Sequence, residues 1–378
     1  MKLNLNNLNK LLLHTFKDEA ELLKNLSKLH SNFTSERGKI SEYRESIALI
    51  SAYTMFYLPT NIIKFKWMMY FLQHTINDVA KLENDMADCD FIDLGTGPAT
   101  YVLAYLDYFS KFQTKNNKIY AIDCSDLMLK QANLCVQSLF PIFKEKVSFG
   151  KWKAHELQKI VSSERKKWLF VGHSLDEIGQ ESVLNYVEKI NPKVITFLTP
   201  GTSSSFKELM IIGHELRRKR YTMIYPCHFS CLSPPNDHCP LLKQTQEERW
   251  CHQVIKGDFS EDVTRLSQLA SIDRRYLPFI AHIYVCDSDY ETNANANANT
   301  IDNKMRGRVV KFIGESKADI QLDVCILKEQ KQLVRVQILK RDIRDNLKRV
   351  RSILLGDTLT FEIKKVISND FYRIGVFL

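Results

Sequence analysis

The chain has 378 residues, of which 44% are hydrophobic and 26% charged, and its formal net charge is +9. This length predicts two or three domains, and the composition is that of a globular protein that needs neither a metal nor disulfides merely to fold. The apolar runs, such as Trp168–Val171, are far shorter than a membrane span, and the first residues lack the apolar segment of a secretory signal. We therefore expect neither a membrane protein nor a secreted one.

Residues 1–85 are predicted to form a helical N-terminal region. Apolar residues recur at helical spacing between Leu11 and Leu23, and a second apolar-periodic stretch runs from Ile47 to Leu72. Because proline lacks a backbone N–H and crowds the preceding turn, we expect the second stretch to break at Leu58-Pro59.

Residues 86–220 alternate between short apolar strands and amphipathic helices. Such a succession predicts a mostly parallel sheet covered on both faces, which is a Rossmann-like α/β fold. The expected helices are 99–112 and 127–139, and the expected strands are Phe91–Leu94, Lys118–Ile122, Val147–Trp152, Trp168–Val171 and Val194–Leu198.

The rest of the chain divides into three parts. Residues 221–286 form a Cys-rich segment that completes the central domain, and little regular structure is expected in its proline-containing first part, 221–260. Residues 287–304 are polar and of low complexity, which predicts a flexible linker. Residues 305–378 contain five short strand patterns and a basic, helix-like stretch at Arg341–Leu354, which predicts a small β barrel or sheet domain.

The positive charge is concentrated at the C-terminal end. Residues 303–378 contain 17 Lys and Arg residues against 9 Asp and Glu residues. This asymmetry favours a polyanionic partner, most simply RNA, over a basic solvated surface that has no partner.

A glycine turn in Phe91-Ile-Asp-Leu-Gly-Thr-Gly-Pro98 follows the first predicted strand and opens a helix. Glycines let the backbone pass close under a ligand at the carboxyl end of a parallel sheet. The third glycine of a dinucleotide fingerprint is missing, and an acidic residue before the glycines is typical of S-adenosylmethionine-binding folds. The alternative is a tight turn that binds nothing.

Asp123 ends the second strand, where a carboxylate can hydrogen-bond a ribose diol. It could instead cap the following helix, a role that Ser125 could equally serve. The candidate cofactor-binding residues are Asp93, Gly95, Gly97, Pro98 and Asp123.

No residue stands out as a catalytic base. Ser174-Leu-Asp-Glu177 follows the fourth strand, where many methyltransferases place residues that face the methyl acceptor. His173 is interpreted as a hydrogen-bonded loop histidine rather than a base. Catalysis is therefore left open by the sequence.

Nine cysteines in an intracellular-type chain favour metal ligation or buried thiols over disulfides. Cys227, Cys231, Cys239 and Cys251 lie within 25 residues, at irregular spacings that fit a zinc ribbon poorly and leave an iron–sulfur cluster open. The alternative is four buried or free thiols.

Several short motifs together resemble the methyltransferase-like small-ribosomal-subunit assembly proteins of mitochondria and bacteria. The motifs are Pro226-Cys-His228, Cys239-Pro-Leu241, Trp250-Cys-His252, the loop Pro200-Gly-Thr202, and the C-terminal Arg306-Gly-Arg308, Leu322-Asp-Val-Cys325 and Leu355-Gly-Asp357. The resemblance extends from about Tyr43 to Phe361.

The resemblance implies a small-subunit assembly factor that binds small-subunit ribosomal RNA and carries a [4Fe–4S] cluster on a methyltransferase-like fold. By matching, the cluster ligands are Cys227, Cys239, Cys251 and Cys325, and S-adenosylmethionine is the second cofactor. His228 stands where the family has proline and the gap from Cys227 to Cys239 is longer, so Cys231 stays in contention as a ligand. Thr199 replaces the family's acidic residue before Pro-Gly-Thr, which weakens the argument for a catalytic carboxylate there.

An active S-adenosylmethionine-dependent RNA or protein methyltransferase is the alternative function. We expect a monomer without membrane partners, located in a bacterial cytoplasm, or in the mitochondrial matrix if the source is eukaryotic.

Overall fold

The computed structural model describes residues 3, 5–35, 43–73, 79–110, 117–152, 164–226, 239–242, 250–286, 304–327 and 331–377. Cys227, Cys231 and residues 287–303 of the expected linker lie outside this part. Contacts between Cα atoms divide the chain into two compact units. The first consists of Met1–Thr199, Lys256–Leu277 and Ile283–Cys286, and the second of Pro200–Ile255, Pro278–His282 and Asp287–Leu378.

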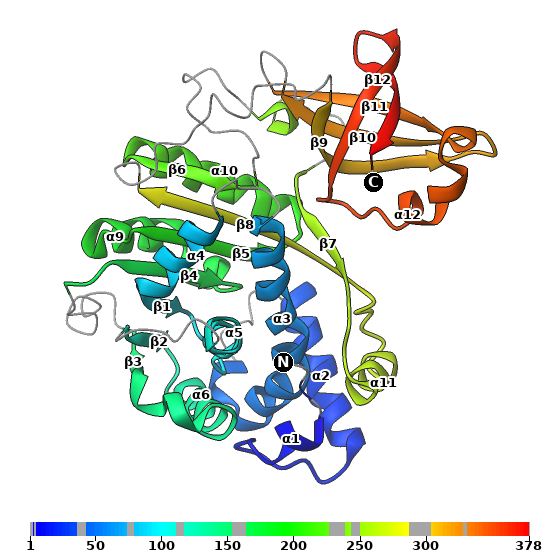
Figure 1. Cartoon of the computed structure of the whole chain (residues 1–378). Helices are drawn as coiled ribbons and strands as arrows, with labels where there is room; N and C mark the ends of the chain where they lie inside the picture. The colour runs from blue at the N-terminus through cyan, green and yellow to red at the C-terminus, as the bar shows by residue number, and fades with distance from the viewer. Residues whose placement is uncertain are drawn as a thin grey trace. The chain divides into compact units, whose positions relative to one another are not determined.

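The first unit begins with helices and continues as a parallel sheet (Figure 1). Its helices are α1 (Leu5–Asn9), α2 (Glu19–Thr34), α3 (Ile47–Gln73), α4 (Val79–Asp88), α5 (Thr100–Phe109), α6 (Asp126–Leu139), α8 (Leu175–Ile178), α9 (Gln180–Ile190) and α11 (Glu261–Leu269), with the 3-10 turn η3 (Pro141–Lys146). Its strands are β1 (Asp90–Leu94), β2 (Ile119–Asp123), β3 (Val147–Lys151), β4 (Lys167–Gly172), β5 (Val194–Pro200) and the ends of β8 (Tyr276–Cys286).

The sheet of the first unit has the order β3-β2-β1-β4-β5-β8, and the neighbours from β3 to β5 are all parallel. Its interior is aromatic: the Phe91 ring stacks on Tyr105 at 4.3 Å between centroids, and the buried Trp168 indole donates a 2.9 Å hydrogen bond to Thr196. From β1 the chain builds the sheet outward through β2 to β3, and it then crosses to β4 on the other side of β1. Such folds bind ligands at this switch in the strand order. The expected Rossmann-like α/β fold is thereby confirmed.

The expected break at Leu58-Pro59 is wrong, because α3 continues through Pro59 to Gln73. A proline inside a helix costs about 3 kcal/mol. Most of α3 is buried, and it packs against α2, α5 and α6. The burial of apolar side chains on both sides of Pro59 therefore outweighs the lost hydrogen bond.

The second unit has two parts (Figure 1). The central part comprises α10 (Ser203–Arg218), β6 (Tyr221–Tyr225), the 3-10 turn η4 (Pro240–Leu242), β7 (Gln253–Lys256) as far as Ile255, and the middle of β8. Both β6 and β7 pair with β8. The expected Cys-rich irregular stretch thus carries short strands at its two ends.

The C-terminal part is a closed barrel of five strands in the order β10-β11-β13-β12-β9. The strands are β9 (Met305–Glu315), β10 (Asp319–Leu327), β11 (Lys331–Leu339), β12 (Thr358–Ser368) and β13 (Phe371–Phe377). β11 and β13 pair in parallel, whereas the other pairs are antiparallel, and a helical segment joins β11 to β12. This arrangement is that of an OB-fold, so the expected small β domain is confirmed as a barrel.

The helical segment that joins β11 to β12 consists of the 3-10 helix η8 (Lys340–Asn346) and the short helix α12 (Leu347–Arg351). Ile343 and Val350 anchor it in the apolar interior of the barrel. Its exposed positions include Arg344, Lys348 and Arg349, so the segment presents positive charge to solvent. Within the part of the chain that the structure covers, no helix has the length and hydropathy to cross a bilayer.

Candidate functional site

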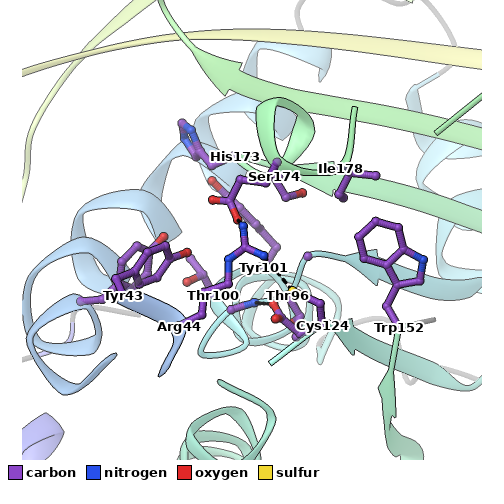
Figure 2. Close-up of a pocket in the computed structure, with 16 residues that line it drawn as sticks. Tyr43, Arg44, Thr96, Thr100, Tyr101, Cys124, Trp152, His173, Ser174 and Ile178 are labelled. Atoms are coloured by element: carbon purple, nitrogen blue, oxygen red, sulfur yellow. Dashed lines mark hydrogen bonds and ion pairs between the residues drawn. The ribbon is translucent and has the colours of Figure 1, made fainter. Parts of the chain in front are cut away.

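A pocket lies at the carboxyl ends of β1, β2 and β4 in the first unit (Figure 2). Parallel α/β sheets bind ligands at this edge, where the strand order reverses. The pocket is lined by Tyr43, Arg44, Tyr53, Gly95, Thr96, Gly97, Thr100, Tyr101, Asp123, Cys124, Trp152, Gly172, His173, Ser174, Glu177 and Ile178.

The glycine turn after β1 has a left-handed backbone at both glycines. The φ angle is +77° at Gly95 and +55° at Gly97. A Cβ on Gly95 would lie 2.3 Å from the Cβ of Ser174, whose hydroxyl donates a 2.7 Å hydrogen bond to the carbonyl of Leu94. A Cβ on Gly97 would meet nothing within 4 Å, so this residue faces open space. The turn is thus packed on one side and open on the other.

Gly95→Ala is expected to lower the free energy of unfolding by about 2–4 kcal/mol, because the new methyl overlaps Ser174 and the backbone needs a positive φ. Gly97→Ala is the matched control, and only the positive φ counts against it, at about 1 kcal/mol. Urea unfolding of both variants measures the difference. Equal losses would contradict the tight packing of Gly95 against Ser174.

Asp123 ties the glycine turn to the end of β2. Its Oδ2 accepts a 2.9 Å hydrogen bond from the backbone N–H of Gly97, and its Oδ1 accepts one of 3.0 Å from Ser125. Burial raises the pKa of Asp123 although these hydrogen bonds favour the ionised form. The cap of α6 is Ser125, whose hydroxyl accepts from the N–H of Met128. The capping role therefore falls to Ser125, and Asp123 faces the pocket.

Asp93 and Pro98 are not among the residues that line the pocket. Both are buried. Thr96 donates a 2.7 Å hydrogen bond to Oδ2 of Asp93, while Oδ1 has no hydrogen-bond partner among the described residues. Burial raises the pKa of Asp93 to about 7. Of the five candidate cofactor-binding residues, the structure thus brings Gly95, Gly97 and Asp123 to the pocket.

An ion pair crosses the pocket between Arg44 and Glu177, with 2.5 Å between Nη2 and Oε2. Arg44 also donates a 2.9 Å hydrogen bond from Nη1 to the sulfur of Cys124, and Figure 2 shows its side chain in the middle of the pocket. Burial raises the pKa of Glu177 to about 7, against the opposing effect of Arg44. The pair is therefore sensitive to protonation near neutral pH.

The free space left in the pocket is about 40 Å³. Sites for small organic ligands usually enclose roughly 300–1,000 Å³. The free space is thus small, and the Arg44–Glu177 ion pair occupies part of the pocket between the glycine turn and the helix α8 that follows β4.

His173 follows β4 at the pocket wall with a left-handed backbone, at a φ of +57°. Its Nε2 lies 3.0 Å from Nζ of Lys64, a residue that is 4% exposed. Burial lowers the pKa of both groups well below their ordinary values, and the charge of Arg274 acts in the same direction. The pair is thus a buried hydrogen bond that favours neutral forms, which agrees with the interpretation of His173 as a hydrogen-bonded histidine.

The sequence did not point to the pocket residues from the helical region. Tyr43, Arg44 and Tyr53 precede the glycine turn by about forty to fifty residues. No local spacing links them to it. The weak signal available was that the family resemblance begins near Tyr43.

The proposed metal ligands that the structure describes all lie in the second unit. Cys239, Cys251 and Cys325 are half-buried, and Cys227 lies outside the described residues. The turn η4, which follows Cys239 directly, packs against β11, and β11 pairs with the strand that carries Cys325. Among the residues described, no three Cys, His, Asp or Glu side chains are gathered closely enough to hold a metal ion.

Whether the second unit suits an anionic thiolate centre depends on its charges. The buried guanidinium of Arg308 interacts with the thiol of Cys251. Its Nε and Nη2 atoms have no hydrogen-bond partner among the described residues. Soft thiol donors beside a buried cation fit an anionic, thiolate-bound group.

Comparison with known proteins identifies one family. The model of a family described as mitochondrial small ribosomal subunit Rsm22 matches residues 53–360. No curated protein matches the chain in sequence.

Several solved structures are similar to part of the chain. The methyltransferase domain of a bacterial Hen1 is 12% identical, over 55% of this chain and 95% of that one, with a TM-score of 0.32. A putative RNA methyltransferase from Pyrococcus horikoshii is 10% identical, over 59% and 82%, with a TM-score of 0.33. The N-terminal domain of human METTL16, solved with SAH, is 11% identical, over 60% and 70%, with a TM-score of 0.32.

Proposed function

The chain belongs to the Rsm22 family of mitochondrial small-ribosomal-subunit proteins, and from this membership we propose that it acts in the assembly of the small ribosomal subunit. The single observation that carries the proposal is the family match, which runs from α3 through the sheet of the first unit into the last part of the barrel. The protein would act as a monomer. The family description favours the mitochondrial matrix over a bacterial cytoplasm as its compartment.

The test of this function is depletion of the protein in its host. The ratio of mature small to large subunits, measured on a sucrose gradient, should fall, and precursors of the small-subunit RNA should accumulate. Re-expression of the intact chain is the control and should restore the ratio. An unchanged ratio after complete depletion would contradict an assembly role.

We propose that the partner is small-subunit ribosomal RNA and that the barrel provides the contact. The support is the excess of Lys and Arg beyond residue 303 together with the exposed basic segment η8–α12. Such side chains bind phosphates largely irrespective of sequence, because the gain comes from released counterions.

We propose that Cys227, Cys239, Cys251 and Cys325 hold one [4Fe–4S] cluster, with Cys231 as the rival for Cys227. The support is the shared location of three of these thiols in the second unit and the buried guanidinium of Arg308 beside Cys251. When bound, the cluster would supply a covalent staple between the Cys-rich segment and β10.

We propose that S-adenosylmethionine, or its demethylated product, binds between the glycine turn and Asp123. Calorimetric titration of the whole protein is expected to detect binding, and Gly97→Asp should abolish it. The new side chain would project into the open space above Gly97 and place a second carboxylate near Asp123.

Gly314→Asp is the matched control for the titration, since a Cβ on this glycine of β9 also meets nothing within 4 Å. It should bind as the wild type does. Wild-type protein that shows no heat of binding with either ligand would rule the site out.

An active RNA or protein methyltransferase is the second candidate. The observation that favours it is the glycine turn with its Asp123 carboxylate, together with the buried His173–Lys64 pair at the pocket wall. Transfer of a tritiated methyl group to immature small subunits separates the candidates. Incorporation that Gly97→Asp removes would establish catalysis, whereas binding without incorporation would assign the ligand a structural role.

A further inference from the structure

A buried arginine lies in the second unit. Arg308 on β9 is 5% exposed, and its Nε and Nη2 have no hydrogen-bond partner among the described residues. Charges taken out of water are retained in folded proteins when an opposite charge or a full set of hydrogen bonds compensates them. Among the described residues, the charge of Arg308 is therefore only partly compensated.

The groups that surround Arg308 are a phenol and a thiol rather than a carboxylate. The guanidinium lies over the ring of Tyr225, 5.5 Å from its centroid, and interacts with the Tyr225 hydroxyl and the Cys251 thiol. The positive charge of Arg308 acts on the Asp357 carboxyl, but no ion pair joins the two among the described residues.

The strand register sets Arg308 directly opposite a second cysteine. Arg308 of β9 pairs with Cys325 of β10 in the antiparallel ladder. Side chains at directly opposite positions leave the same face of a sheet, with Cβ atoms roughly 4.5–5.5 Å apart. Arg308 thus has Cys325 of the barrel opposite it in the ladder, while its guanidinium interacts with Cys251 of the Cys-rich segment, and the two cysteines are far apart in the sequence.

We propose that Arg308 is the built-in counter-cation of an anionic thiolate centre ligated by Cys251 and Cys325. The inference rests on the proposed cluster, and it gives a separate reason for the position of that cluster. Arg308 is a positioning residue: its free N–H groups would donate to the thiolate sulfurs and offset their charge. Such neighbours set both the retention and the potential of a thiolate-bound centre.

The test compares the whole protein, purified anaerobically, as wild type, Arg308→Gln, Arg308→Lys and Arg306→Gln. The control Arg306→Gln removes the same charge from an exposed position two residues away. The readouts are iron and sulfide per chain, the rate of iron release to a chelator, and the reduction potential of the bound centre.

Arg308→Gln is expected to release iron roughly 10–100-fold faster and to shift the potential to more negative values. Arg308→Lys should bring the rate of iron release and the reduction potential partly back to the wild-type values, and Arg306→Gln should behave as wild type. A urea titration of the iron-free protein adds a second measurement. Because the anionic centre is then missing, Arg308→Gln should leave the urea midpoint of unfolding unchanged or raise it.

Failure of the proposed cluster and failure of the inference about Arg308 give different results. Wild-type protein without iron and sulfide would overturn the proposed cluster and this inference with it. A wild-type cluster that Arg308→Gln keeps, with unchanged release rate and potential, would overturn the inference alone. Equal destabilisation of the iron-free and the loaded protein by Arg308→Gln would do the same, because it would assign Arg308 an ordinary packing role.

Discussion

Replacing Cys325 by serine is expected to leave the anaerobically purified protein with little iron and no acid-labile sulfide. A serine hydroxyl is a poor substitute for a thiolate on iron, and three remaining thiols hold a four-iron cluster weakly. Structural metal sites contribute on the order of 10 kcal/mol of binding free energy to folding. The variant should therefore also unfold the second unit at lower urea concentration. Iron, sulfide and visible absorption measure the first effect.

Cys135→Ala is the matched control for this loss, because Cys135 is buried in α6 of the first unit and is not a proposed ligand. It should keep the full iron content. An intact cluster in Cys325→Ser together with its loss in Cys231→Ser would show that the ligand set is wrong. One zinc per chain and no sulfide would refute the cluster but keep a metal site.

Neutralising the basic segment between β11 and β12 is expected to give the second large effect. The triple variant Arg344→Gln, Lys348→Gln and Arg349→Gln removes three exposed charges that are not part of the barrel interior. Each phosphate contact on single-stranded RNA contributes about −0.7 to the log–log slope of affinity against salt. The slope should therefore become shallower by about 2, with affinity on the order of tenfold weaker. Fluorescence titrations at several salt concentrations measure both.

The matched control removes the same charge from the first unit by Lys24→Gln, Lys130→Gln and Lys144→Gln, at exposed positions. If the RNA contact lies in the barrel, these changes should leave the slope nearly unaltered. Equal flattening by both triple variants would indicate a response to net charge rather than a defined contact.

The parts of the fold that were predictable from the sequence are those with local signals. The glycine turn after Phe91–Leu94 is recognisable because a buried strand, two glycines and a helix follow one another within about twenty residues. The barrel strands were visible as alternating patterns for a similar reason. These signals require no knowledge of distant contacts.

The sequence-based predictions were wrong or incomplete for features that depend on tertiary packing. Pro59 breaks an isolated helix, but α3 is enclosed by other helices, and no local pattern reports that enclosure. The OB-type order of the barrel also lay beyond the sequence, because strand patterns do not say which strands pair. It depends on the parallel pairing of β11 with β13.

The candidate site shows the same division. Gly95, Gly97 and Asp123 follow from strand ends, whereas Arg44 reaches the pocket from a segment far earlier in the chain. The ion pair of Arg44 with Glu177, which leaves the pocket nearly full, is a tertiary feature that spacing could not indicate. Arg308 belongs to the Arg306-Gly-Arg308 motif of the resemblance, but the motif does not indicate that its side chain is buried, which only the structure shows.

The central claim, that this chain is a small-subunit assembly protein that contacts ribosomal RNA, is tested most directly by crosslinking in living cells. The tagged chain is irradiated, recovered under denaturing conditions, and the attached RNA is sequenced. We expect strong enrichment of small-subunit ribosomal RNA at a few sites, and loss of that signal in the triple variant of the basic segment. Recovery of no RNA above that of an untagged control, or of RNA without enrichment of the small-subunit species, would contradict it.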